Sequence, residues 1–316
     1  MSDLALYTGS QHAHARQLAG LQPEELKRRA VLACRENDGA ALWSIVLGYL
    51  TLYGVNTLLT SPHTVRSYRT GVLQFVEYAG ENSWQWLGPR RSDGQLYINS
   101  LLAAGRSIQT VRSRLAAVRL LYRALRWCEA TNSDPFEDTK VPVENTNPWD
   151  RSEPYTEEEL ERLLAAADPT ERALILLLAH GGLRISEALD LLWQDLDLER
   201  SRLRVNRGKG RKQRVVSISR SLAVALGELP RGAAEQRLFP FRGRSGAVKR
   251  LHRAVLESGI RFRGFHAFRK YSGTRLMAQV KDIARVAKHL GHADVNTTRT
   301  YAQLGVDDLQ KELGEW

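Results

Sequence analysis

Four short stretches in the second half of the chain hold side chains suited to chemistry on an anion. "HGGLRISEALDL" contains Arg184 and Glu187, "RGKGRKQ" contains Lys209, "FHAFRKYSGTRL" contains His266 and Arg269, and "KHLGHADVNTTRTY" contains His292 and Tyr301. Together they could transfer a phosphodiester onto the tyrosine, because preorganised cationic donors stabilise the negative charge of such a transition state. A tyrosine hydroxyl, with a pKa near ~10, needs a base or a strong positive field to act as the nucleophile.

Each stretch taken alone also admits a structural role. Arg184 could be a phosphate ligand, or it could form a buried ion pair with Glu187, three residues further on. Lys209, between two glycines, could approach a ligand or could be a solvated turn residue. His266 and Arg269 would share one helix face at their spacing, either around an anion or at the surface. Tyr301 could equally be a core aromatic residue.

A metal site is not predicted. His289 and His292 could suggest zinc, but no third and fourth ligand lies at a usable spacing, and Cys34 and Cys128 are remote. We therefore expect chemistry without a metal or another cofactor.

Positive charge is concentrated in one part of the sequence. The whole chain of 316 residues carries +11, whereas residues 200–270 hold 20 basic and 3 acidic residues, a net +17. The rest of the chain is therefore net negative. Such a concentration indicates a polyanionic partner, most simply nucleic acid bound through its phosphates.

Helices and one hairpin must position these residues. "TEEELERLLAAA" starts with a capping box formed by Thr156 and Glu159, and "DPTERALILLLAHGG" is apolar enough to lie deep in a domain. The β-rich runs 202–206 and 214–219 flank a glycine-lysine turn and predict a β-hairpin. The remaining helices are expected at 220–228, 246–258, 266–279, 281–290 and 295–303.

The region from about 40 to 130 has a helical pattern throughout. Ser61-Pro62 and Ser107 mark two helix starts, and apolar residues recur at helical spacing after each of them. The second of these helices carries arginines opposite its apolar stripe, either a solvated face or a face laid along a DNA backbone.

Length and composition predict two domains. We expect a loosely attached lead-in at 1–38, a helical domain at 39–135, a linker at 136–155 rich in Pro, Asn, Asp and Ser, a second domain at 156–304 and a tail helix at 305–316. No apolar run could span a membrane and no secretion signal is evident, so we expect a cytoplasmic protein. The two lone cysteines suit a reducing compartment.

The order "HGGLRISEAL", "GKGRKQR", "HAFR" and "LGHADVNTTRTY" resembles the tyrosine recombinases, the phage integrase family, and its Xer-like members in particular. The resemblance covers about 150–305, and the helical region before it is similar to the family's core-binding domain in general character. The fold it implies is mainly α, with an N-terminal SAM-like helical domain and an α+β catalytic domain holding a small antiparallel sheet.

The resemblance also implies a role for each position. Tyr301 would be the nucleophile that forms a 3′-phosphotyrosyl bond, and Arg184 and Arg269 would clamp the non-bridging oxygens. Lys209 would protonate the departing 5′-oxygen. The other implied roles are acid–base partner of the tyrosine for His266, hydrogen-bond donor to the phosphate for His292, and orientation of the arginine site for Glu187.

The function implied is site-specific recombination of double-stranded DNA by a tetramer on paired sites, with a second recombinase or an accessory protein as a further possible partner. In this family the tail helix docks on a neighbouring protomer. The alternatives are a type IB topoisomerase and a non-catalytic DNA-binding accessory protein. Basic residues expected to contact DNA are Arg112, Arg119, Arg123, Arg207, Arg211, Lys212, Arg244 and Lys270.

Overall fold

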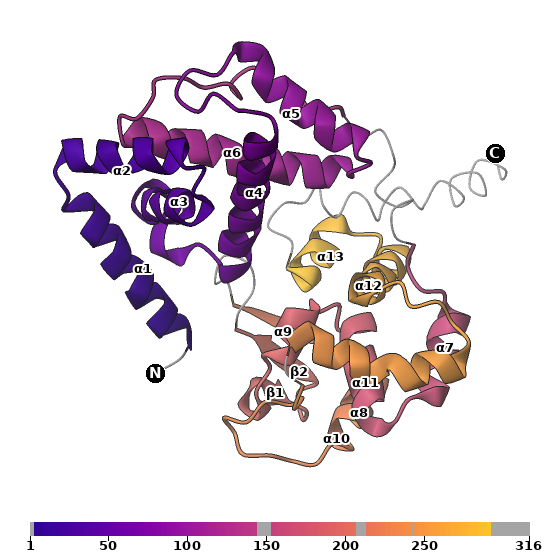
Figure 1. Ribbon diagram of the computed structural model, residues 1–316. Coiled ribbons are helices and arrows are strands. Elements are labelled where there is room, and N and C mark those ends of the chain that lie inside the picture. Colours follow the sequence, from indigo (N-terminus) through magenta and orange to yellow (C-terminus); the bar gives the residue numbers. More distant parts are fainter. Residues whose placement is uncertain (1–2, 144–152, 207–212, 242, 292–316) are drawn as a thin grey trace. The chain divides into compact units, whose positions relative to one another are not determined.

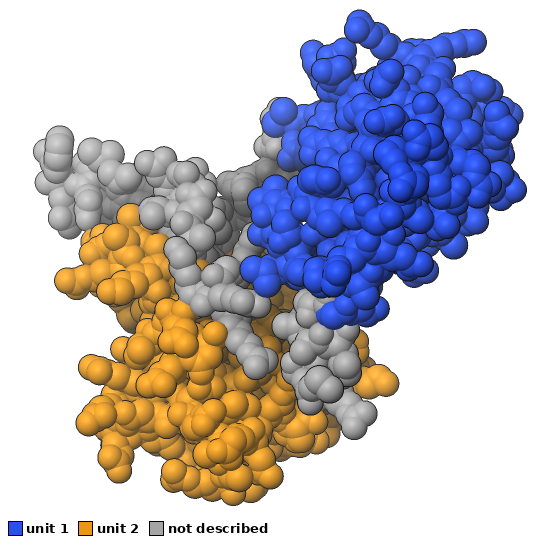
Figure 2. All heavy atoms as spheres, turned by 90° about the vertical axis from the view of Figure 1, so that its left-hand side faces the viewer, with its two compact units in different colours: residues 1–145 blue, residues 146–316 orange. Residues whose placement is uncertain are grey.

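The protein is described here by a computed structural model that covers residues 3–143, 153–206, 213–241 and 243–291. The chain divides into two compact units, residues 1–145 and residues 146–316 (Figure 2). Each unit has its own hydrophobic core. Among the described helices, none combines the length and the apolar character that crossing a membrane would require.

Helices are the only regular secondary structure in the described part of the first unit. Its elements are α1 (Asp3–Ala19), α2 (Pro23–Arg35), α3 (Gly39–Tyr53), η1 (Thr57–Leu59), α4 (Pro62–Glu81), α5 (Arg91–Ala103) and α6 (Ile108–Trp127) (Figure 1). Ser61 and Ser107 cap α4 and α6, as their positions in the sequence predict, by accepting hydrogen bonds from the backbone N–H groups of Thr64 and Thr110. The two capped helices, α4 and α6, pack against one another.

Residues 3–38 belong to this unit, so the prediction of a loosely attached lead-in is wrong. α1 and α2 both pack on α3, and Leu18, Ala30 and Cys34 are buried in the core that α3 shares. The apolar residues of α1 follow no clear helical stripe, which is why the sequence pattern did not predict this helix. Packing against α3, rather than the amphipathicity of α1, holds it in place.

The predicted linker 136–155 is packed into the first unit at its beginning and into the second unit at its end. Phe136 is fully buried in the first unit, where its ring stacks on Trp84 at 6.0 Å and meets Phe75 edge-on at 5.6 Å between centroids. Tyr155 is buried in the second unit and stacks on Phe268 at 4.3 Å. Aromatic side chains therefore extend both units into a segment whose polar composition suggested a linker.

The second unit combines helices with one small sheet. Its elements are α7 (Glu157–Ala166), α8 (Pro169–Ala179), α9 (Ile185–Leu189), η2 (Trp193–Asp195), β1 (Leu196–Asp197), β2 (Arg202–Val205), β3 (Arg214–Ser217), α10 (Arg220–Gly227), α11 (Gly243–Ser258), α12 (Phe265–Val280) and α13 (Ile283–Leu290). Every residue of α8 from Ala173 to Ala179 is buried, as its apolar sequence predicts. α10 and α12 pack on α8, and α13 lies beside α12 (Figure 1).

The predicted hairpin is confirmed. β2 and β3 pair antiparallel with Val205 opposite Arg214, and β1 adds a short third strand on the far side of β2. The predicted capping box of α7 is also present, with Thr156 and Glu159 each accepting a hydrogen bond from the other's backbone N–H. The predicted fold class, mainly α with a small antiparallel sheet in the second unit, is therefore confirmed.

If the segment after α6 is part of the first core, Phe136→Ala should destabilise the protein by about 3–5 kcal/mol, because it leaves a cavity among packed aromatic rings. Urea unfolding of the full chain measures the loss. Val143→Ala is the matched control, since Val143 lies in the same segment and is 77% exposed. Equal and small effects of the two substitutions would contradict the packing described here.

Candidate active site

Glu187 lies at the centre of the candidate site, where it caps its own helix. As the third residue of α9 it accepts a hydrogen bond at Oε2 from the backbone N–H of Arg184, 3.0 Å away. Its Oε1 accepts a second hydrogen bond from Nη1 of Arg184 at 2.8 Å. Arg184 is the donor in both hydrogen bonds, so its backbone and its guanidinium together fix the carboxylate and the arginine against each other at the start of a very short helix.

A second arginine reaches the same carboxylate from the sheet. Arg214, the first residue of β3, donates from Nη2 to Oε2 of Glu187 at 2.8 Å and from Nη1 to Oε1 at 3.1 Å. Burial would raise the pKa of Glu187, but the hydrogen bonds from Arg214 and from the backbone of Arg184, with the charges of both, lower it to about 2. Glu187, only 2% exposed in its side chain, is therefore ionised at neutral pH.

A third arginine, Arg269, lies next to Glu187. Arg269 on α12 is 1% exposed, and its Nη1 lies 4.0 Å from Oε2 of Glu187. It donates from Nη2 to the carbonyl of Leu290 at 2.6 Å and from Nη1 to the carbonyl of Gly182. Two helix-end carbonyls and one carboxylate thus surround this guanidinium.

Gly182 is required at its position beside Arg269. Its φ is +63°, and a Cβ there would come within 2.5 Å of Leu290 and 2.9 Å of Ser272. Only glycine adopts this backbone conformation in so small a space without strain. The double glycine that ends α8 thereby places the Gly182 carbonyl where Arg269 can donate to it.

His266 is the second residue of α12, one turn before Arg269, and is exposed at the surface. Desolvation, followed by the positive charges of Arg269, Lys270 and Arg184, lowers its pKa below the usual value. A lower pKa favours the neutral imidazole near neutral pH, and the neutral ring can accept a proton. The structure therefore brings Arg184 and Arg269 together at Glu187, and His266 lies close enough to both arginines to be affected by their charge.

The other predicted catalytic positions, Lys209, His292 and Tyr301, lie outside the described residues. So do Arg207, Arg211 and Lys212, which were expected to contact DNA. Their roles stay predictions.

The remaining basic positions differ in their surroundings. Arg119 on α6 donates to the backbone carbonyls of Phe136 and Thr139 at 3.0–3.2 Å, so it holds the segment after α6 in place. Arg112 donates to the carbonyl of Pro142 at 3.3 Å.

Arg123 and Arg244 are exposed, whereas Lys270 is buried and burial lowers its pKa. Arg244 lies over the ring of Phe265, the residue before His266, 6.0 Å from the ring centroid. DNA contact by these residues stays a prediction.

Arg214 was not among the residues predicted for the site, although its sequence context carries a signal. Residues 214 and 216 of the strand share a face because side chains alternate along a strand, and Val216 is fully buried. An arginine on the inward face of a strand requires an anionic partner nearby. Glu187 is that partner, but only the fold shows that the two meet.

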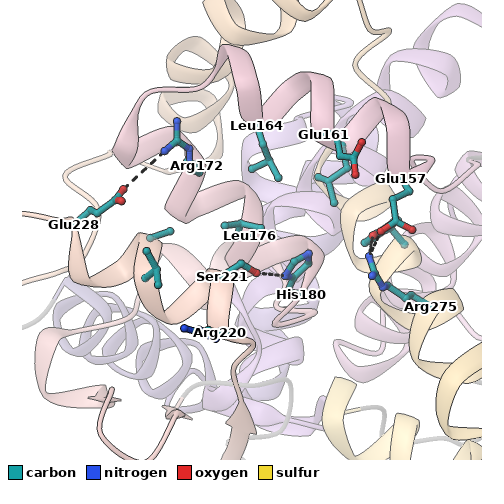
Figure 3. A pocket seen from close by; sticks show the side chains of 14 residues that line it. Glu157, Glu161, Leu164, Arg172, Leu176, His180, Arg220, Ser221, Glu228 and Arg275 are labelled. Carbon is teal, nitrogen blue, oxygen red and sulfur yellow. Dashed lines mark hydrogen bonds and ion pairs between the residues drawn. The ribbon is translucent and has the colours of Figure 1, made fainter.

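A separate pocket of about 770 Å³ lies between α7, α8, α10 and α12 (Figure 3). Leu164 and Leu176 line it, and four of its charged groups form two pairs, Glu157 with Arg275 and Arg172 with Glu228. None of the residues around Glu187 lines it.

Comparison with known protein families gives two matches. Residues 154–306 match the phage integrase family, and residues 57–129 match the N-terminal SAM-like domain of phage integrases. Together the two matched ranges cover most of the chain. They also agree with the division of the described structure into a helical first unit and a second unit that holds the arginine cluster.

Individual proteins show the same likeness. The chain is 30% identical to tyrosine recombinase XerA of Thermococcus kodakarensis, over 83% of this chain and 90% of that protein. It is also 30% identical to tyrosine recombinase XerC of Pseudomonas aeruginosa, over 79% of this chain and 86% of that protein.

Solved structures agree in fold. The XerH site-specific recombinase bound to its palindromic difH substrate matches with a TM-score of 0.62 and 20% identity, covering 99% of this chain and 96% of that one. A lambda integrase dimer bound to a core site matches with a TM-score of 0.60 and 14% identity, over 80% and 90%. With the fold, the family matches and the relatives in agreement, the chain belongs to the tyrosine recombinases, the phage integrase family of site-specific DNA recombinases.

Proposed function

We propose that this recombinase binds double-stranded DNA and cleaves one strand with Tyr301 as the nucleophile. The tyrosine oxygen attacks the scissile phosphorus, a 3′-phosphotyrosyl bond forms, and the 5′-oxygen leaves with a proton. The 5′-hydroxyl of a second strand then attacks the phosphotyrosine, which restores a phosphodiester and frees the enzyme. The bond energy is kept in the covalent intermediate, so the cycle requires neither ATP nor a metal.

The charge of the cluster around Glu187 is the observation that supports this chemistry most directly. Three guanidinium groups, those of Arg184, Arg214 and Arg269, share a single ionised carboxylate. The cluster therefore keeps a net charge of +2. A fixed excess of positive charge stabilises the additional negative charge of a pentacovalent phosphorus, because its dipoles and charges need no reorganisation during the reaction.

Arg184 and Arg269 are assigned to the non-bridging oxygens. The side chain of Arg184 is 33% exposed while its Nη1 remains on Glu187, so its guanidinium is both oriented and open to a ligand. Arg269 is oriented by two backbone carbonyls. The planar fork of each guanidinium suits paired phosphate oxygens.

His266 is assigned as the acid–base partner of Tyr301, because its lowered pKa favours the neutral ring that can accept the phenol proton. Lys209 is assigned to the departing 5′-oxygen and His292 to a hydrogen bond on the phosphate. These last two assignments and that of Tyr301 depend on the family motif alone.

DNA as the partner is supported by relatives of known structure. The solved XerH and lambda integrase chains were both bound to DNA. The basic stretch 200–270, with its net +17, offers the charge that phosphates require. Strand exchange between two sites would involve four protomers, and whether they are all copies of this chain is open to test.

A nicked suicide duplex that carries the recognition site tests the nucleophile. Wild-type protein should form a covalent complex that survives SDS, because the short cleaved fragment diffuses away and cannot be rejoined. Tyr301→Phe should bind the duplex with similar affinity and give no covalent complex, since phenylalanine lacks the attacking oxygen. A covalent complex formed by Tyr301→Phe would show that another residue is the nucleophile.

The same substrate tests the arginine cluster. Arg184→Ala should retain binding and slow single-turnover cleavage by roughly 10²–10³-fold, a loss of about 3–4 kcal/mol of transition-state stabilisation. Arg200→Ala is a control, because Arg200 is 77% exposed and pairs only at 3.5 Å with Asp197 within the described residues. Equal rates for the two variants would exclude Arg184 from the reaction.

Assembly is tested by deleting residues 305–316. This deletion should weaken cooperative binding to paired sites and leave binding to a single site largely unchanged, as expected if this segment contacts a neighbouring protomer. Gel-shift titrations on one-site and two-site duplexes measure both. An equal loss on both substrates would contradict the proposal, and supercoil relaxation without joining of two sites would instead favour a topoisomerase-like activity.

A further inference from the structure

We propose that Arg214 is a positioning residue for strand cleavage, which fixes Arg184 and Arg269 relative to one another through the carboxylate of Glu187. This inference rests on the proposed function. Arg214 itself is not expected to touch the phosphate, because its guanidinium is already directed at other groups and its side chain is only 12% exposed.

All three guanidinium nitrogens of Arg214 donate hydrogen bonds within the protein. Nη1 and Nη2 donate to the two oxygens of Glu187, at 3.1 and 2.8 Å. Nε donates to the backbone carbonyl of His289 at 3.2 Å. The side chain therefore joins β3, from which it comes, to the start of α9 and to the end of α13.

The end of α13 is shaped to receive this guanidinium. Gly291, which follows α13, has a φ of +67°, and a Cβ at this position would lie 2.8–2.9 Å from Cδ, Nε and Cζ of Arg214. The guanidinium thus packs directly on the Gly291 backbone. It also places a positive charge at the carbonyl end of a helix, where a cation is stabilising.

Through Glu187, the contact with Arg214 also restrains Arg184 and Arg269, the two arginines assigned to the phosphate. Its two oxygens are shared between Arg184 and Arg214, and Oε2 lies 4.0 Å from Arg269. Of the hydrogen bonds between described residues, the carboxylate without Arg214 keeps those from Arg184, and its plane is no longer fixed by this bidentate partner. Arg184 could then follow the carboxylate away from the position that a phosphate requires.

Lysine can supply the charge of Arg214 but not its geometry. A single ammonium group cannot contact both carboxylate oxygens in one plane and the His289 carbonyl at the same time. Arg214→Lys should therefore restore part of what Arg214→Ala loses, which separates charge from positioning.

The experiment compares Arg214→Ala and Arg214→Lys with Arg237→Ala on the nicked suicide duplex. Arg237 is a matched control, because it pairs at 3.0 Å with Asp190, just after α9, but at the exposed surface. We expect Arg214→Ala to slow single-turnover cleavage by roughly 10–100-fold, by analogy with residues that orient metal ligands. DNA affinity should change by less than about 3-fold, Arg214→Lys should fall between Arg214→Ala and wild type, and Arg237→Ala should match wild type.

A pH profile of the cleavage rate provides a readout that a general loss of stability would not give. Burial would raise the pKa of Glu187, and the hydrogen bonds and charges of Arg214 and Arg184 hold it at about 2, so its protonation does not limit the wild type near pH 5. Among the described residues, Arg269 lies 4.0 Å from Glu187, and His266 and His289 lie close enough to the arginines of the cluster for those charges to lower their pKa. Without Arg214 the pKa of Glu187 rises, and cleavage should fall on the acid side by more than the fall that protonation of His266 gives in the wild type. Adding Glu187→Gln should remove this additional fall and leave the part that belongs to His266.

The proposal is overturned if Arg214→Ala cleaves at the wild-type rate, or if Arg214→Lys is no better than Arg214→Ala and Arg214→Ala shows no acid limb beyond that of the wild type. It is also overturned if affinity and thermal stability fall in step with the cleavage rate. If wild-type protein forms no covalent complex at all, the proposed function itself fails, which is a distinct result.

Discussion

One buried carboxylate holds the catalytic unit's positive charges together. Removing Glu187 from water is costly, and three arginines that converge on one spot would repel one another. The arginines stabilise the buried charge of Glu187 and keep it ionised. The carboxylate in turn reduces the repulsion among the arginines, so that they can lie close together. The cluster remains positive overall, which is the property that chemistry on a phosphodiester requires.

The surrounding fold brings the ends of two helices and one strand together around this cluster. The end of α8 supplies the Gly182 carbonyl, the end of α13 supplies those of His289 and Leu290, and β3 supplies Arg214. Helix ends leave carbonyl groups without intrahelical partners, and guanidinium groups are well suited to satisfy them. The two glycines at 182 and 291 allow these ends to approach closely enough.

Not all of the positive charge in residues 200–270 is available to DNA. Arg253 and Arg250 pair with the buried Glu171 and its neighbour Asp168, and Arg263 pairs with Glu159. Arg214 and Arg269 are engaged at Glu187, whereas Arg250 and Arg253 are exposed but paired with carboxylates of the same unit. The net +17 of this stretch therefore includes side chains that stabilise the fold.

The sequence by itself determined the helices with strong caps, the hairpin, the fold class and the family, because each depends on local spacing or on motif order. It also placed Arg184, His266 and Arg269 in one site. Only the tertiary structure decided that α1 and Phe136 belong to a core, that Arg119 holds a backbone segment, and that Arg214 meets Glu187. These contacts join residues far apart in the chain or lack a periodic pattern, so nothing local in the sequence specifies them.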